Sequence, residues 1–431
     1  MFNNILKLLT GTMISQIINI AASPILSRLF SPAEFGISTM FQSITSIMLI
    51  VCTLKLDSAV MIPKSEILAK RLLKSSLFYT SIFSLGTILT LSVLSILNIS
   101  ILGFENTLFI VLLLSLMVLF TGTNSSYTNW ANRQRDYKIM MWVPIVNTGT
   151  ATLINVLLGY LDFKTYGLII GIVSGQFITA SILLFLYKIP DVDTKLKYTT
   201  KKYSQFPLYQ MPSLLLNTIS VQVAIFAFYF FYNDTITGWY SMAQRILLMP
   251  LTILGSAIAQ IYYKEAVALF HHDKSLKKLT ERIVYSSYLV IFLPMYIIMC
   301  FGESLFSSFF GEDWGEAGEI SAYLAPWFLM VFVGSPLSIL FMVLGKQKIN
   351  FLFNTIMLVS RLTVIWLGSL FFQDYLQTVA LFGITGFGLW FFISIYLMKS
   401  VGVNPYKYSA YSVIYFLILF LSVIFTKSIT S

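Results

Sequence analysis

The sequence predicts an all-α integral membrane protein with twelve core transmembrane helices in two six-helix lobes and a thirteenth helix at the C-terminus. First, 57% of the 431 residues are hydrophobic and only 11% are charged. A soluble domain carries about 25% charged residues, so a soluble enzyme, a secreted scaffold and a disordered chain are excluded. Second, apolar runs of about twenty residues follow one another, which suits spanning helices and not the alternating strands of a barrel. Third, one long polar stretch divides the runs into two sets of six.

The apolar runs place the spans along the chain. The first run leads directly into a second one and exceeds the apolar core of about 7–15 residues in a signal peptide, so we expect it to be retained. The thirteenth run has no counterpart in the first half and is interpreted as an appendage. The predicted spans cover residues 8–27, 35–54, 75–97, 107–128, 142–161, 166–187, 208–231, 238–262, 283–301, 319–344, 350–371, 376–398 and 408–426.

Basic residues in the loops predict the orientation. If the N-terminus is cytoplasmic, most of the 28 Lys and Arg residues lie on the cytoplasmic side, as the positive-inside rule requires. The net charge of +10 then reflects topology, and we expect no nucleic-acid partner.

The longest polar stretch, KIPDVDTKLKYTTKKYSQF, predicts a linker between two lobes. The expected domains are an N-terminal lobe (1–187), a cytoplasmic linker (188–207), a C-terminal lobe (208–398) and the extra helix (399–431). Six crossings return the chain to its starting side, so the lobes are predicted to be parallel repeats about an axis along the membrane normal. Three sets of residues recur in matching spans: Gly36, Met40 and Gln42 as Gly238, Met242 and Gln244; Arg133-Gln134-Arg135 as Lys346-Gln347-Lys348; and Asn147-Thr148 as Asn354-Thr355.

The remaining loops offer no place for catalysis. They hold no Gly-rich phosphate cradle and no set of metal ligands at workable spacing. The acidic run at 303–319 is interpreted as a solvated loop, with a sugar or cation patch as the alternative. We therefore predict a transporter that is not an enzyme and that needs no cofactor and no metal.

Ionisable residues within spans are costly and usually line a cavity or pair with one another. Arg361 lies near the middle of the eleventh span and is the strongest candidate for substrate binding. Arg245 in the eighth span could bind substrate or reach the interface. Arg28 and Lys55 end the first two spans, where interfacial anchoring is the alternative, and Asp57 is a local counter-ion of Lys55 or part of the site. An excess of cations suits an anionic cargo, because arginine binds phosphate bidentately.

Neutral polar residues extend this candidate site. Gln16 and Asn19 lie three residues apart on one helix face. Such groups either hold helices together or line a wet lumen. Asn147, Asn354 and Gln244 complete the predicted set of substrate-binding residues.

The N-terminal segment carries a family resemblance. GTMISQIINIAASPILSRLFSPAEFGISTMFQS followed by LKLDSAVMIPK resembles the start of bacterial polysaccharide flippases of the Wzx type. These belong to the multidrug/oligosaccharidyl-lipid/polysaccharide exporter superfamily, and the resemblance implies a MATE-like fold with two bundles around a cavity. The signature maps onto Arg28, Ser31, Pro32, Glu34 and Gly36.

The resemblance implies a flippase that moves an undecaprenyl-diphosphate-linked oligosaccharide, an O-antigen or capsule precursor, from the cytoplasmic to the periplasmic leaflet by alternating access. Its expected location is the bacterial inner membrane, and its expected partners are the lipid-linked glycan and membrane lipids, with a polysaccharide polymerase and a chain-length regulator as protein candidates. Two alternatives stay open. A cation-coupled drug or metabolite antiporter would be expected to carry carboxylates in helices 1 and 7, which hold none. A membrane polysaccharide polymerase would need a large periplasmic loop.

Overall fold

The computed structural model describes residues 2–96, 107–193, 195–272, 274–372 and 374–404, and beyond these residues 406–408, 410–411, 413–414 and 417. Throughout these ranges the regular structure is helical and holds no strand, which confirms the predicted all-α class. The predicted thirteenth span falls largely outside the described residues.

The chain forms two compact units. Unit 1 comprises residues 1–30 and 37–219, and unit 2 comprises residues 31–36 and 220–431. The division thus passes through two helices, α2 and α9. The helices of unit 1 are α1 (Phe2–Leu29), most of α2 (Pro32–Cys52), α3 (Leu56–Ala59), α4 (Glu66–Ile96), α5 (Thr107–Arg133), α6 (Tyr137–Tyr160), α7 (Lys164–Tyr187), α8 (Leu196–Lys202), a π-helical turn (Phe206–Gln210) and the start of α9 (Met211–Phe231).

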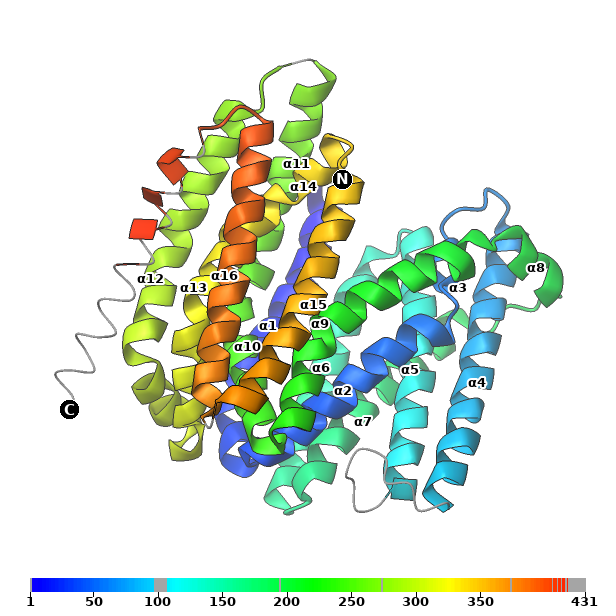
Figure 1. Ribbon diagram of the computed structural model, residues 1–431. Helices are drawn as coiled ribbons and strands as arrows, with labels where there is room; N and C mark the ends of the chain where they lie inside the picture. The colour runs from blue at the N-terminus through cyan, green and yellow to red at the C-terminus, as the bar shows by residue number, and fades with distance from the viewer. Residues whose placement is uncertain are drawn as a thin grey trace. The chain divides into compact units, whose positions relative to one another are not determined.

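Unit 2 holds the rest of α9 and the helices that follow it. In Figure 1, α12, α13 and α16 run side by side within this unit. Its elements are α10 (Asp234–Pro250), a π-helical turn (Leu251–Gly255), α11 (Ser256–His271), α12 (Lys277–Phe310), a 3-10 turn (Glu312–Trp314), α13 (Gly315–Leu337), α14 (Ile339–Val343), α15 (Gln347–Phe371) and α16 (Tyr375–Ser400).

Ten helices of the described part are long and apolar enough to cross a membrane. Each of the first twelve predicted spans overlaps a helical segment, and the helices run further than the apolar runs. The 34 residues of α12, for example, make a helix about 51 Å long, whereas a hydrocarbon core is about 30 Å thick. The protein is therefore a multi-pass membrane protein. The ten do not include α1 or α10, of which α10 has only 17 residues.

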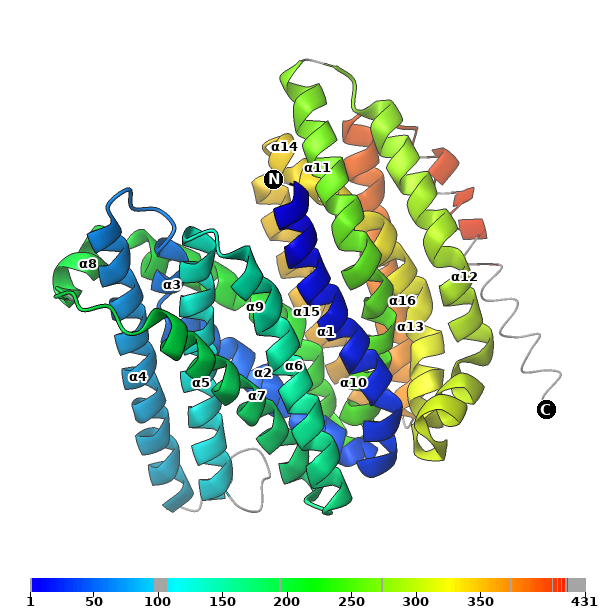
Figure 2. The ribbon, with the colours of Figure 1, turned by 180° about the vertical axis from the view of Figure 1, so that it is seen from behind.

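Close packing in unit 1 depends on small residues. The helices α1 and α6 lie side by side in Figure 2, and a Cβ added to Gly11 would lie 2.5 Å from the carbonyl oxygen of Met141. Between α4 and α5 the Ser76 and Ser126 hydroxyls lie 2.8 Å apart. Small and hydroxylated side chains allow membrane helices to approach and to hydrogen-bond each other.

The predicted linker folds onto unit 1. It contains α8, and the ammonium of Lys74 on α4 donates to the carbonyl oxygen of Val192 over 2.8 Å. The hydroxyls of Tyr79 and Thr200 lie 3.0 Å apart. The basic stretch is thus held against α4, and the compact units divide later, between Ile219 and Ser220.

Within unit 2 the first turn of α2 crosses the first turns of α10 with a reciprocal geometry. A Cβ on Gly36 would lie 1.9 Å from the carbonyl oxygen of Asp234, and a Cβ on Gly238 would lie 1.8 Å from that of Pro32. In each case the glycine meets the residue that corresponds to the N1 position of the other helix. Only glycine allows the two backbones to come this close.

The caps of these two helices also correspond. Ser31 and Glu34 form a capping box, in which the Ser31 backbone N–H donates to Glu34 Oε2 over 2.7 Å and the Glu34 N–H donates to Ser31 Oγ over 3.4 Å. Asn233 caps α10 by accepting from the backbone N–H of Ile236 over 2.8 Å. The capping residues and the crossing glycines occupy corresponding positions at the starts of α2 and α10, which supports the predicted internal repeat.

Candidate functional site

Arg361, the strongest candidate from the sequence, lies on α15 inside the helix bundle of unit 2. One terminal nitrogen of its guanidinium donates to the backbone carbonyl of Ser220 on α9. Its Cζ lies 5.5 Å from the centre of the Trp327 ring on α13, a cation–π distance. A Cβ on Gly386 of α16 would lie 2.5 Å from that ring, so glycine gives the indole its place beside the arginine.

Two donors in this cluster have no protein acceptor. The Nε–H of Arg361 and the Nε1–H of Trp327 are both buried, and neither has a hydrogen-bond partner in the described part of the chain. They border a small void, in which the centre of a water molecule could move through a volume of about 10 Å³. A water molecule needs about 10–15 Å³ by this measure. The void therefore takes a single small species and is too small for a phosphate group.

Arg245 has a different setting on α10. Its side chain is exposed, and none of the described residues forms an ion pair or a hydrogen bond with it. The helix begins at Asp234, so Arg245 lies about 17 Å along its axis. Arginines within membrane spans usually face a protein interior or a water-filled cavity, because contact with lipid tails costs about 3 kcal/mol or more.

The other predicted residues of unit 2 are less constrained. Gln244 is half-buried beside Arg245 on α10, and Asn354 is exposed on α15, two turns before Arg361. No hydrogen bond joins either side chain to Arg245 or Arg361 in the ranges that the structure covers.

In unit 1 the structure brings Lys55 and Asp57 together. After α2 ends, Leu54 and Lys55 adopt left-handed backbone angles (φ 48° and 56°) that turn the chain into α3. The Asp57 carboxylate is 1% exposed, and its Oδ2 lies 4.0 Å from Lys55 Nζ. This geometry supports the counter-ion interpretation of Asp57, because the charge of Lys55 is already paired within the protein.

Donors from the turn between α2 and α3 and from α5 complete the surroundings of Asp57. The Thr53 hydroxyl donates to Asp57 Oδ1 over 3.1 Å, and the Ser125 hydroxyl donates to Oδ2 over 2.6 Å. The Asn129 amide also donates to Oδ2, over 3.4 Å. Ser125 and Asn129 stand four residues apart and so share one face of α5. A buried carboxylate with these partners is a structural tie between α5 and the α2–α3 turn.

Sequence reasoning missed the role of Arg133, which ends the same face of α5. Its guanidinium donates to the carbonyl oxygens of Val60 and Pro63 over 3.0 and 2.6 Å. Arg133 therefore holds the loop after α3, a role beyond the topological one that the sequence predicts for it. The spacing of four between Ser125, Asn129 and Arg133 was the available signal.

Replacing Asp57 by alanine is expected to lower the free energy of unfolding by about 3–5 kcal/mol, because it leaves a largely buried ammonium and three donors without an acceptor. Asp57→Asn, which keeps an acceptor oxygen, should cost less. Denaturant unfolding of the purified protein measures both effects. Asp191→Ala is the matched control, since Asp191 is exposed. An unchanged stability in Asp57→Ala would contradict the structural tie.

The candidates on α1 and α6 have no common contact. Arg28 is exposed at the end of α1, and Gln16 and Asn19 are half-buried on the same helix. Asn147 is half-buried on α6, and its backbone carbonyl faces Gly175 of α7. Among the described residues, no hydrogen bond joins these four side chains to each other or to Asp57.

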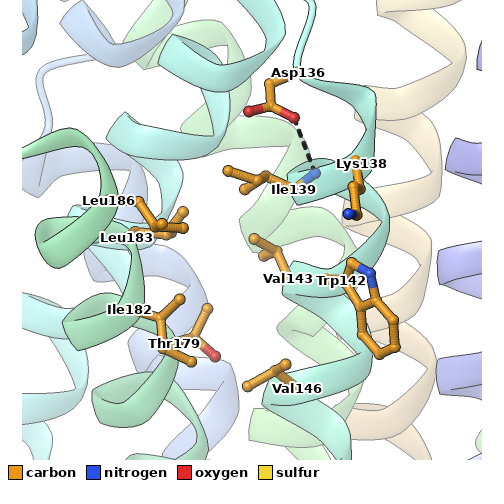
Figure 3. Close-up of a pocket in the computed structure, with 10 residues that line it drawn as sticks. All are labelled: Asp136, Lys138, Ile139, Trp142, Val143, Val146, Thr179, Ile182, Leu183 and Leu186. Carbon is orange, nitrogen blue, oxygen red and sulfur yellow. Dashed lines mark hydrogen bonds between the residues drawn. The ribbon is translucent and has the colours of Figure 1, made fainter.

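Unit 1 also carries an apolar groove of about 420 Å³ between α6 and α7 (Figure 3). Its walls are aliphatic side chains and Trp142, and Asp136 and Lys138 lie at one end. Asp136 is engaged, because its carboxylate caps α6 at Ile139 and accepts from the Tyr187 hydroxyl over 3.1 Å. Lys138 is exposed.

The described residues contain no group of three or more His, Cys, Asp or Glu side chains that could bind a metal ion.

Known proteins share both sequence and fold with this chain. The succinoglycan biosynthesis transport protein ExoT of Rhizobium meliloti (strain 1021) is 22% identical over 309 residues, which cover 70% of this chain and 61% of that protein. The chain thus spans about three-fifths of this relative's length.

Two solved structures have the same fold. An inward-facing multidrug resistance transporter of the MATE family in the MOP superfamily matches with a TM-score of 0.72 and 14% identity over 92% of this chain and 98% of that one. The lipid II flippase MurJ, in an inward closed conformation, matches with a TM-score of 0.71 and 15% identity over 97% of each chain. At these identities the likeness concerns the fold alone, and it confirms the MOP-type architecture.

The family assignment agrees with the resemblance in the N-terminal segment. A family model described as "Polysaccharide biosynthesis protein" matches residues 25–319, well over half of the sequence. The chain therefore belongs to the polysaccharide biosynthesis protein family, within the MOP-type fold.

Proposed function

We propose that this protein is a flippase for a lipid-linked saccharide whose carrier lipid bears a diphosphate. The observation that carries the proposal is Arg245, an exposed cation about 17 Å along α10, within the predicted span 238–262, for which no described residue forms an ion pair or a hydrogen bond. A polysaccharide biosynthesis protein that is a membrane transporter must move a glycan across the bilayer, and in bacteria such glycans travel on undecaprenyl diphosphate. The diphosphate supplies the anion that Arg245 lacks.

The chemistry of the two partners matches. A guanidinium binds phosphate oxygens through paired hydrogen bonds and stays charged in a medium of low dielectric constant. The void beside Arg361 is too small for a phosphate group, so we assign the contact with the diphosphate to Arg245. Gln244 beside it has both a donor and an acceptor for sugar hydroxyls.

Outward transport from the cytoplasmic to the periplasmic leaflet follows from the same charge. With the cell interior negative, moving one negative charge outward is favoured by about 2.3 kcal/mol per 100 mV. We propose alternating access in the bacterial inner membrane with a cytoplasmic N-terminus, which agrees with the basic loops. Transport needs no covalent step, and we propose no enzymatic activity.

A cation-coupled drug antiporter of the same fold is less well supported. Antiport of a cation requires a group that exchanges it, and α1 and α9, which open the two halves, contain no Asp or Glu. The buried carboxylate of unit 1, Asp57, is instead held by Lys55 and three other donors.

The test is a reconstituted flipping assay. Proteoliposomes that hold an undecaprenyl-diphosphate-linked oligosaccharide in one leaflet are probed with a lectin that cannot cross the bilayer. We expect the protein to make the saccharide accessible on the opposite side, with a faster rate under an inside-negative potential. Liposomes that carry a cationic dye and a proton gradient test the antiporter. Dye movement without saccharide movement would overturn the flippase proposal.

A further inference from the structure

The cluster around Arg361 contains a half-buried positive charge that no described residue balances with an ion pair. The only ion pairs among the described residues are Lys55–Asp57 and Lys70–Glu66, both in unit 1. Arg361 instead contacts a carbonyl oxygen, Ser220 O, and the face of an indole ring, Trp327. These neutral partners stabilise a guanidinium less than a counter-ion does. A charge in a helix bundle without a counter-ion would therefore be stabilised by a bound anion.

The unused donors of the cluster meet at one void. Arg361 Nε–H and Trp327 Nε1–H are buried without an acceptor, and both side chains line the void. Trp327 is 3% exposed, so water at the protein surface does not satisfy its indole N–H. Leaving a buried donor unsatisfied costs about 1–3 kcal/mol. One of these donors belongs to the guanidinium itself and the other lies beside it. Together they suit a ligand that only accepts hydrogen bonds.

The other polar groups at the void can adapt to such a ligand. The hydroxyls of Ser360 and Thr385 donate to carbonyl oxygens of their own helices, Met357 O and Leu381 O, over 3.0 and 2.7 Å. A hydroxyl can rotate to donate elsewhere. No carboxylate lines the void, so nothing in its wall repels an anion.

The size of the void selects the ligand. Its volume of about 10 Å³, measured for the centre of a water molecule, is enough for one water molecule. A halide ion is a single atom of comparable size, whereas phosphate and sulfate carry four oxygens. The walls formed by Met357, Phe382 and the Trp327 ring are apolar.

We propose that Arg361 and Trp327 form a binding site for one monovalent anion of chloride size in the bundle of unit 2. The anion accepts from Arg361 Nε–H and from Trp327 Nε1–H, and it balances the guanidinium charge. The site is distinct from the proposed contact between Arg245 and a diphosphate, and its occupation does not require a transported substrate.

Halide-dependent stability of the purified protein tests this proposal. The midpoint of thermal unfolding is measured in sodium chloride, bromide and gluconate at equal ionic strength. For the wild type we expect the midpoint to rise with chloride or bromide and to saturate, because a ligand that binds only the folded state stabilises it. Arg361→Gln should remove the rise. Trp327→Phe keeps an aromatic face beside Arg361, although a smaller one, and loses the Nε1–H donor, and should weaken halide binding by about 10-fold or more.

Two controls make the result specific. Arg282→Gln removes an exposed arginine from the first turns of α12 and should leave the halide response unchanged. Bromide in a crystal should give an anomalous peak within hydrogen-bond distance of Arg361 Nε and Trp327 Nε1. If Arg361→Gln does not fold, Trp327→Phe and the bromide peak still decide the matter.

A midpoint that does not depend on the halide, together with no bromide peak at this position, would overturn the proposal and assign the void to water only. A halide response that survives in both variants would overturn it as well. These measurements use no saccharide, so their failure is distinguishable from a failure of the flippase proposal.

Discussion

Replacing Arg245 by alanine is expected to slow saccharide flipping by a factor of about 10 to 100. The factor corresponds to the loss of a charge-assisted hydrogen bond, worth about 1.5–3 kcal/mol. Arg245 is exposed and unpaired in the described part of the chain, so its removal leaves no protein group unsatisfied and the fold should survive. Arg245→Lys should retain part of the activity, because an ammonium keeps the charge and loses the bidentate geometry. Arg245→Glu should abolish flipping by repelling the diphosphate.

The reconstituted lectin assay measures these rates, and unfolding in detergent checks that each variant is folded. Arg282→Ala is the matched control, because Arg282 is also exposed and lies near the start of α12 instead of deep along a helix. Wild-type rates in Arg245→Ala and Arg245→Glu would remove this residue from the transport path.

Gly36→Ala and Gly238→Ala should each lower the free energy of unfolding by about 3 kcal/mol. Each added Cβ would lie less than 2 Å from a backbone carbonyl oxygen of the other helix, so the crossing of α2 and α10 must open. Overpacking of this kind costs about 1–3 kcal/mol, and a backbone neighbour cannot move aside as a flexible side chain can. Chemical denaturation of the purified variants measures the effect.

The double variant gives a sharper test of the same contact. Once one alanine has pushed the helices apart, the second should cost little, so the two effects should not add. Gly86→Ala on α4 is the control, because nothing lies within 4 Å of its added Cβ and alanine favours a helix. Independent, additive effects at Gly36 and Gly238 would show that the two glycines do not share one crossing.

Much of the fold follows from the sequence, because a membrane helix must satisfy its own backbone and expose apolar side chains. Every apolar run from 8–27 to 376–398 overlaps a helical segment. The ends were less predictable. Polar turns such as those that begin α4 and α12 continue the helix beyond the hydrocarbon without an apolar signal.

The candidate site was only partly predictable, since a sequence shows which charges exist and not which are paired. In the sequence, Lys55 and Arg245 look alike as candidate cations. The structure separates them, because Asp57 balances Lys55 and no described residue balances Arg245. Arg133 went unrecognised, since its partners are backbone carbonyls, which carry no sequence signature.

The sequence by itself determined the class of the protein, its spanning segments and its family, because composition, run length and a local motif are properties of the chain order. Tertiary structure alone decided which polar groups remain unsatisfied. Two donors from α13 and α15 meet at a void of water size, and two glycines about two hundred positions apart allow two helix starts to touch. Such features depend on the distances between helices, and packing sets those distances.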